Sequence, residues 1–239
     1  MKIKPLHPLI SCICITSNRP DMLLKAILSF DQQNYPNREL IISYPEDDVE
    51  SELLLLQILK ISQLEIVTIT RPAKQSIGHA RNNAVAKSNG KYICMWDDDD
   101  IYYYTRIADQ HNIMRGDGRY FQSSLIPQII LFDATENKAY LSFPYHWSGS
   151  LLCKKEHLLQ YPCTDSNQFE CAPVIDYLSS RKLILQTMLS PSLYTYVYHG
   201  QNETEYFNFQ YLIRKSQPLE EGYAQNIQQY LNQQLKINI

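Results

Sequence analysis

The sequence lacks the features that would place it in a membrane or on a nucleic acid. No apolar stretch approaches the length of a membrane span, and the start, Met-Lys-Ile-Lys-Pro-Leu-His-Pro, shows no signal-peptide cleavage pattern. The formal net charge is only -3, so no global attraction to nucleic acid or anionic lipid is expected. We therefore expect a cytoplasmic protein without a nucleic-acid partner.

Paired metal-binding cysteines, a linker and internal repeats are also missing. The six cysteines show no CxxC spacing, and three lie in strand-like runs where free cysteine packs as a small hydrophobic residue, so we predict reduced thiols. Without a linker, residues 1–239 are expected to form a single domain. The cysteines are Cys12, Cys14, Cys94, Cys153, Cys163 and Cys171.

The first hundred residues alternate between strand-like and helix-like patterns. Alternating and β-branched runs predict strands, and capping residues, an early proline and helix-favouring residues predict the helices between them. This order predicts right-handed crossovers and a doubly wound, mainly parallel α/β sheet. The predicted strands are residues 9–16, 39–44, 64–70 and 91–96, and the predicted helices are residues 22–33, 45–62 and 76–88.

The rest of the chain predicts a mixed α+β half over residues 101–217 and a peripheral C-terminal helix over residues 218–239. The C-terminal part is polar and rich in glutamine, with one apolar stripe. The other expected elements are a helix at 101–114, strand-like runs at 120–132 and 138–143 that form a loose hairpin, a short helix at 154–160 and a β-like run at 191–199.

Four consecutive aspartates, Asp97 to Asp100, follow directly on the apolar strand at 91–96. In open α/β sheets, ligands bind just past the carboxyl ends of the strands. Adjacent carboxylates repel one another unless a cation neutralises them, and oxygen ligands are the chemistry of Mg²⁺, Mn²⁺ or Ca²⁺. A solvated acidic loop or a helix N-terminus is the alternative for such a run, but the strand in front of it favours a metal site.

Five segments in this order resemble the family 2 glycosyltransferases of GT-A fold. The resemblance spans about residues 8 to 202 and implies a Rossmann-like, inverting, nucleotide-sugar-dependent enzyme. It makes residues 1–100 the nucleotide-sugar-binding half and residues 101–217 the acceptor and catalytic half. The matching segments are residues 8–20, 29–37, 77–82, 90–100 and 191–199.

The resemblance also assigns site residues around the aspartates. A sugar nucleotide would lie across the carboxyl ends of the first strands, with a divalent metal bridging its diphosphate to an Asp-x-Asp motif at Asp97, Asp98 and Asp99. Asp97 would face the ribose or sugar, and Asp99 would ligate the metal. His199 would add a nitrogen ligand, which favours Mn²⁺ over Mg²⁺. A hydrogen-bonded histidine at a strand end is the alternative role for His199.

Three further residues are expected to contact the nucleotide. The family carries a nucleotide-contacting arginine at the position of Arg81, and a guanidinium near a helix N-terminus suits a diphosphate. A surface arginine is the alternative. Thr16 and Arg19 close the first strand, where family members hold the base and ribose largely through backbone groups.

The chain departs from the family pattern after the second strand. The family shows Asp-Asp-Gly-Ser there, and its first acid reads the nucleobase, but this chain has Ser43-Tyr-Pro-Glu-Asp-Asp48. Either Asp47 or Glu46 reads the base through a longer loop, or Tyr44 stacks on it. Helix capping by Asp47 and Asp48 is an equal alternative.

The catalytic base is the second departure, because the usual adjacent acidic pair is absent. Glu170 and Asp176 are the candidates, with Glu170 preferred as the base and Asp165 third. The missing pair leaves open a catalytically silent module that binds a sugar nucleotide or glycan. Trp147 is a candidate for acceptor contact, with a place in the core as its alternative.

The predicted function is metal-dependent transfer of a hexose from a nucleoside diphosphate sugar, with UDP favoured, to a glycan or lipid-linked sugar acceptor. Mn²⁺ or Mg²⁺ would be the cofactor. A lipid-linked acceptor would bring the enzyme to the inner face of the membrane by peripheral association. The donor sugar, the acceptor and the oligomeric state stay open.

Overall fold

A computed structural model describes residues 7–116, 121–185 and 189–234. Its first hundred residues alternate strand and helix as the sequence predicts, and the three crossovers join parallel strands. The elements are β1 (Ile10–Ile15), α1 (Pro20–Asp31), β2 (Arg38–Pro45), α2 (Val49–Ile61), β3 (Ile66–Arg71), α3 (Ile77–Lys87) and β4 (Tyr92–Met95).

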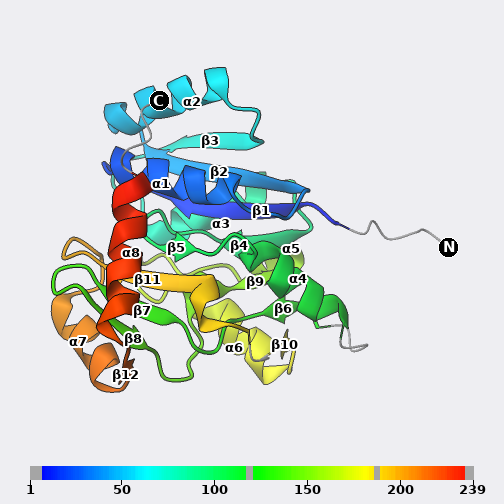
Figure 1. Cartoon of the computed structure of the whole chain (residues 1–239). Helices are drawn as coiled ribbons and strands as arrows, with labels where there is room; N and C mark the ends of the chain where they lie inside the picture. Colours follow the sequence, from blue (N-terminus) through cyan, green and yellow to red (C-terminus); the bar gives the residue numbers. More distant parts are fainter. Residues whose placement is uncertain (1–6, 117–120, 186–188, 235–239) are drawn as a thin grey trace.

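These strands belong to a seven-stranded sheet in the order β10-β6-β9-β4-β1-β2-β3 (Figure 1). Strands β1 to β4 are parallel, and β9 pairs antiparallel with β4 and β6. The added elements are β6 (Ser123–Ser124), β9 (Leu152–Lys154), β10 (Ile184–Leu185), α4 (Arg106–Gly116), α5 (Lys155–Gln160) and α6 (Ala172–Ser180). The mainly parallel α/β sheet is therefore confirmed.

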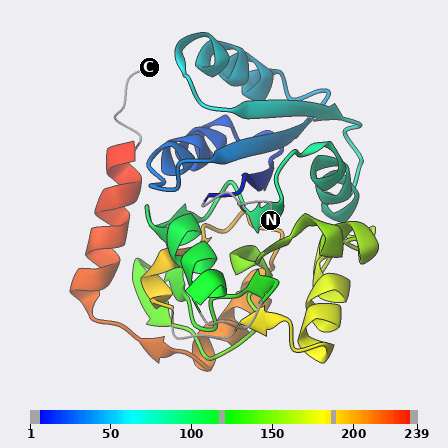
Figure 2. The same cartoon turned by 90° about the vertical axis from the view of Figure 1, so that its right-hand side faces the viewer.

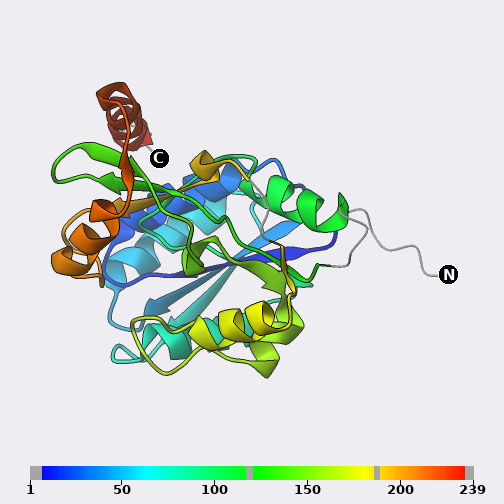
Figure 3. The same ribbon diagram turned by 90° about the horizontal axis from the view of Figure 1, so that it is seen from below.

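Helices cover both faces of this sheet, as the view from below in Figure 3 shows. Residues of α1, α2 and α4 share one buried cluster with Cys12 and Cys14, whereas residues of α3, α5 and α6 share another with Ile13 and Ile15. The alternating side chains of β1 thus face opposite layers, as the period of two in a strand requires. Because both faces are covered, the carboxyl ends of the strands are left for the site.

A second sheet of five strands has the order β12-β8-β7-β11-β5. The C-terminal helix packs against it through Ala224, which shares a buried cluster with Ile130 and Phe132. Figure 2 shows this helix as a rod along one side of the molecule. The elements are β5 (Ile101–Tyr102), β7 (Ile130–Asp133), β8 (Lys138–Leu141), β11 (Tyr194–Tyr198), β12 (Gln217–Pro218), α7 (Tyr206–Arg214) and α8 (Glu221–Gln234), with 3₁₀ turns at Ser148–Ser150 and Pro191–Leu193.

The second half differs from the sequence prediction in several places. The expected helix at 101–114 begins only at Arg106, because Ile101–Tyr102 pairs as β5 with the distant β11. The expected single strand at 120–132 is two short strands in different sheets, with Pro127 between them. Helix α7 and strands β9, β10 and β12 were not predicted. Residues 120 and 235–239 of the expected elements lie outside the described residues.

All six cysteines are free and buried. In the described part of the chain, no helix combines the length and the apolar character needed to cross a bilayer.

Candidate active site

Asp97 to Asp100, which we call the acidic segment, lie at the carboxyl end of β4. The last of them, Asp100, turns inward. Asp100 is buried, and its carboxylate accepts hydrogen bonds from the Tyr194 hydroxyl at 2.6 Å and the Val197 N–H at 3.0 Å. Burial, followed by the charges of Asp99 and Asp97, raises the pKa of Asp100 well above its usual range. Asp100 therefore ties the acidic segment to β11, which ends beside His199.

Asp98 joins the ends of β1 and β4. The Thr16 hydroxyl donates to its Oδ2 at 2.6 Å, and the Arg19 guanidinium pairs with its Oδ1 at 2.7 Å. Burial, followed by the charge of Asp99, raises the pKa of Asp98 to about 7, although the charge of Arg19 opposes the rise. Three of the residues predicted to bind the donor, Thr16, Arg19 and Asp98, thus lie in contact.

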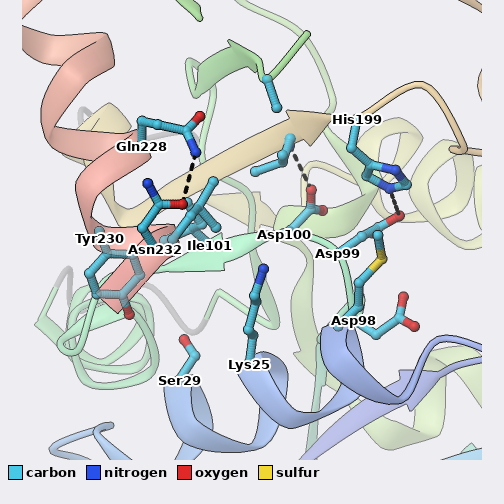
Figure 4. A pocket seen from close by; sticks show the side chains of 14 residues that line it. Lys25, Ser29, Asp98, Asp99, Asp100, Ile101, His199, Gln228, Tyr230 and Asn232 are labelled. Carbon is cyan, nitrogen blue, oxygen red and sulfur yellow. Dashed lines mark hydrogen bonds and ion pairs between the residues drawn. The ribbon is translucent and has the colours of Figure 1, made fainter. Parts of the chain in front are cut away.

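Asp99 faces the end of β11. One of its carboxylate oxygens, Oδ2, lies 3.0 Å from Arg19 Nη1, 3.3 Å from His199 Nε2 and 3.4 Å from Asn202 Nδ2. Burial favours a raised pKa, but the hydrogen bond from His199 and the charge of Arg19 outweigh it and lower the pKa of Asp99. Figure 4 shows the Asp99–His199 pair, so the two predicted metal ligands lie next to each other.

The donor chemistry of this pair suits a divalent metal with few protein ligands. An Asp oxygen and a His nitrogen match Mn²⁺, with Mg²⁺ as the harder, oxygen-preferring alternative. Within residues 7–116, 121–185 and 189–234 no cluster of three or more His, Cys, Asp or Glu could enclose an ion by itself. A metal held by Asp99 and His199 would therefore complete its coordination with substrate phosphate and water, as Mg²⁺ and Mn²⁺ sites in phosphate-binding enzymes do.

Arg81 links two carboxylates on the other side of β4. Its Nη2 lies 2.5 Å from Asp97 Oδ1, and its Nε lies 2.9 Å from Glu170 Oε1. The third nitrogen, Nη1, lies 3.2 Å from the sulfur of Met95. Burial would lower the pKa of Arg81, but Asp97 and then Glu170 raise it well above its usual range. Nη1 and Nη2 thus donate hydrogen bonds to protein atoms, whereas Nε lies within ion-pair distance of Glu170 without a hydrogen bond to a residue that the structure describes.

The three candidate bases lie in different surroundings. Glu170 is buried beside Arg81, whereas Asp176 lies on the exposed side of α6. Asp165 accepts a hydrogen bond from the Ser76 hydroxyl at 2.5 Å, and Ser76 caps the N-terminus of α3. Of the three, only Glu170 lies in an ion pair that reaches the acidic segment.

The turn between β2 and α2 places the neighbouring acids Asp47 and Asp48 in different surroundings. Asp48 is buried and caps α2 by accepting from the Ser51 N–H at 3.1 Å, and it also accepts from the Asn18 N–H at 2.6 Å. Asp47 is exposed. Tyr44 is buried within β2, and its hydroxyl accepts a hydrogen bond from Thr70 at 3.2 Å. The capping alternative therefore holds for Asp48, whereas Asp47 is free to reach a ligand.

Two residues near the site were missed by the sequence analysis. Arg71, at the end of β3, is buried and donates from Nη1 to the Thr16 carbonyl at 3.0 Å. Asn202 accepts from the His199 N–H at 2.8 Å and donates to the Val197 carbonyl at 2.8 Å, so it fixes the turn that carries His199. Gly200, which follows His199, was a local sign of a tight turn in the sequence. In the structure its φ is +84°.

Trp147, the candidate for acceptor contact, takes its alternative place in the core. It is 9% exposed and packs against the rings of Phe143 and Tyr145, with centroids 5.8 and 5.4 Å away.

A cavity of about 220 Å³ opens between α1, the acidic segment and α8. Figure 4 shows Lys25 of α1 projecting into it between Asp98 to Asp100 on one side and Tyr230 and Asn232 of α8 on the other. The C-terminal helix thus forms one wall of a space that adjoins the Asp99–His199 pair.

Comparison with known families identifies the chain. The sequence pattern of glycosyl transferase family 2 matches residues 11–164, which include the acidic segment and Arg81. The chain belongs to this family. The predicted family and its glycosyltransferase class are thereby confirmed.

Two curated relatives of this glycosyltransferase come from Escherichia coli. It is 28% identical over 106 residues to the UDP-Glc:alpha-D-GlcNAc-diphosphoundecaprenol beta-1,3-glucosyltransferase WfgD, and the match covers 44% of this chain and 41% of the relative. It is 30% identical over 116 residues to the UDP-Glc:alpha-D-GlcNAc-diphosphoundecaprenol beta-1,3-glucosyltransferase WfaP, and this match covers 48% of this chain and 45% of the relative. The matched segments thus span less than half of each relative.

Solved structures confirm the GT-A fold of this glycosyltransferase. Residues 1–349 of S. aureus TarS in complex with UDP superpose with a TM-score of 0.57 at 13% identity, and the match covers 90% of this chain and 68% of that 1–349 chain. The mannosyltransferase PcManGT from Pyrobaculum calidifontis, in complex with GDP-Man and Mn²⁺, gives a TM-score of 0.61 at 11% identity, covering 94% and 70%.

Proposed function

We propose that this chain is a metal-dependent, inverting hexosyltransferase that moves a sugar from a UDP-sugar to a lipid-linked sugar acceptor. The observation that carries the proposal is that two groups of interacting side chains meet at the end of β4. The Asp99–His199 pair lies on one side, and Glu170, linked to Asp97 through Arg81, lies on the other. The E. coli relatives are named for UDP-glucose and a GlcNAc-diphosphoundecaprenol acceptor, which favours glucose as the hexose.

The donor is expected to lie across the ends of β1 and β4. Thr16 and Arg19 would hold its nucleoside end together with Asp98, and Asp97 would face the ribose or sugar. Asp47, exposed in the β2–α2 turn, is the stronger candidate for reading the base, since Tyr44 is buried among core side chains. Asp99 and His199 would hold Mn²⁺ or Mg²⁺, which supplies positive charge to the diphosphate as it becomes the leaving group.

Glu170 would act on the acceptor. Its carboxylate takes the proton from the acceptor hydroxyl while that oxygen forms a bond to the anomeric carbon and the bond from this carbon to the diphosphate breaks. A single displacement of this kind inverts the anomeric centre. Because Glu170 is buried beside a guanidinium, it is held in one place before the acceptor arrives.

The acceptor class also bears on where the enzyme acts. A diphospholipid acceptor stays in the bilayer, so transfer to it would take place at the inner face of the membrane through peripheral association. The cavity between α1 and α8, with the Lys25 ammonium in its lining, is a place where an anionic group of a substrate could enter.

The metal role is tested by thermal unfolding with UDP in Mn²⁺ and in chelator. UDP should raise the unfolding temperature in Mn²⁺ only, since the diphosphate and the aspartates repel each other without a cation. Asp99→Ala should remove the metal-dependent part of the rise. An equal rise in Mn²⁺ and in chelator contradicts the metal role, and a rise with GDP in place of UDP corrects only the base preference.

The transfer itself is tested with UDP-glucose and a GlcNAc-diphospholipid with a short lipid chain. The product should carry a new glycosidic bond of inverted configuration, which NMR of the anomeric proton resolves. Binding of UDP without transfer or donor hydrolysis, over a broad panel of donors, would contradict the proposed activity.

A further inference from the structure

The segment that carries Glu170 is held on α3 by hydrogen bonds along its length. We call residues 163–170 the base segment. The Asn82 side chain exchanges two hydrogen bonds with the backbone of Cys163, at 2.8 and 2.9 Å, and the Gly78 N–H donates to the Ser166 carbonyl at 2.9 Å. The Ile77 N–H donates to the Asn167 side chain at 2.9 Å. The base segment therefore takes its position from α3.

Gly78 makes this close approach possible. A Cβ at this position would lie 1.8 Å from the Thr164 carbonyl oxygen and 3.1 Å from the Glu170 Cβ. The oxygen is a backbone atom, so it cannot move aside without moving the base segment. Any side chain at residue 78 would thus push the base segment away from α3.

Arg81 lies one turn further along the same helix and holds the end of the base segment by charge. It is 7% exposed, and its guanidinium stands between Glu170 and Asp97. The side chain that would receive the acceptor proton and the side chain that would face the donor are thus fixed to one rigid, planar group.

We propose that Arg81 is a positioning residue that sets the distance between Glu170 and Asp97, with Gly78 as the steric part of the same device, and that it does not bind the diphosphate. The inference rests on the proposed role of Glu170 as the base. It assigns to Arg81 a different part from the nucleotide contact that the family resemblance implies. A positioning role predicts that substitution of Arg81 lowers turnover and spares UDP affinity, whereas a diphosphate contact predicts that it lowers UDP affinity.

Arg81→Lys and Gly78→Ala separate these parts. Lysine keeps the charge but cannot bridge two carboxylates in a fixed plane, so turnover should fall about tenfold to a hundredfold while the affinity for UDP with Mn²⁺ changes less than about threefold. Gly78→Ala should likewise lower turnover and leave UDP affinity nearly unchanged, although it alters no charge. Gly222→Ala is the matched control, because nothing lies within 4 Å of the added Cβ, and it should behave as the wild type.

The stability of each variant separates positioning from general damage. Circular dichroism and thermal unfolding establish that each variant is folded.

Four outcomes decide between the proposals. A loss of UDP affinity in Arg81→Lys that matches its loss of kcat/KM, with kcat unchanged, returns Arg81 to the diphosphate and overturns the proposal. Wild-type turnover in Gly78→Ala also overturns it. If Glu170→Gln keeps wild-type turnover, the proposed base is wrong; if Glu170→Gln is inactive but Arg81→Lys is not, only the positioning role fails.

Discussion

Glu170 is the residue on which the proposed transfer depends most, because its carboxylate would accept the proton. Glu170→Gln keeps the shape of the side chain but cannot accept a proton, so turnover should fall by roughly a hundredfold or more while UDP and metal binding stay nearly intact. Asp176→Asn, on the exposed side of α6, is the matched control and should lose far less. Transfer assays with calorimetric titration of UDP measure both effects.

A wild-type rate in Glu170→Gln together with a large loss in Asp176→Asn would reverse the assignment. The amide also removes one charge from the Arg81 ion pairs, so the unfolding temperature of each variant is measured beside its rate.

At this scale the sequence allowed the acids to be found but not their partners. The position of Asp97 to Asp100 after an apolar strand was enough to predict a site at a strand end. It could not distinguish Asp100, which is turned inward onto Tyr194 and Val197, from Asp99, which faces His199. That difference arises from the pairing of β5 with β11, two strands more than ninety residues apart in the chain.

At the scale of single elements, the turn into α2 has two neighbouring acids with different surroundings. Asp48→Ala removes the N-cap of α2 and the acceptor of the Asn18 N–H, so it should lower the free energy of unfolding by about 1 to 2 kcal/mol. Asp47→Ala should leave stability unchanged and weaken UDP binding. Urea unfolding and UDP titration of both variants measure these effects.

If Asp47→Ala binds UDP as the wild type does, Asp47 does not read the base, and Glu46 becomes the next candidate. If Asp48→Ala is as stable as the wild type, the capping role is wrong.

The helices and strands of the first half could be predicted because local signals set them. Asp48 and Ser76 cap their helices through short-range hydrogen bonds, and the alternating residues of β1 face two helical layers. The second half was harder, because β5, β6 and β10 have two residues each and exist only through partners far along the chain. Periodicity within a short window contains no record of such partners.

At the scale of the whole molecule, the second half is joined to the first through buried aromatic contacts as well as the shared sheet. His111 of α4 is 1% exposed and lies edge-on to Tyr35 and Tyr92 of the first half, with ring centroids 5.3 and 5.6 Å away. Its Nδ1 is buried and has no hydrogen-bond partner among the residues that the structure describes. A proton on this ring would therefore be poorly solvated.

Burial, followed by the charges of Arg115, His7 and Lys91, lowers the pKa of His111 to about 4. In the unfolded chain its pKa returns to about 6.5, so the unfolded state binds the proton first as the pH falls. The stability due to the neutral ring is thus complete above pH 6.5 and is lost progressively as the pH falls from there toward 4, by at most about 3 kcal/mol.

His111→Phe keeps an aromatic ring that does not titrate, and carboxylates that titrate in the same range are common to both proteins. Urea unfolding at a series of pH values should therefore show that the wild type loses more stability than His111→Phe between pH 6.5 and 4. Parallel curves for the two proteins would mean that the ring becomes protonated within the folded state, and that the contact between the two halves opens to water at low pH.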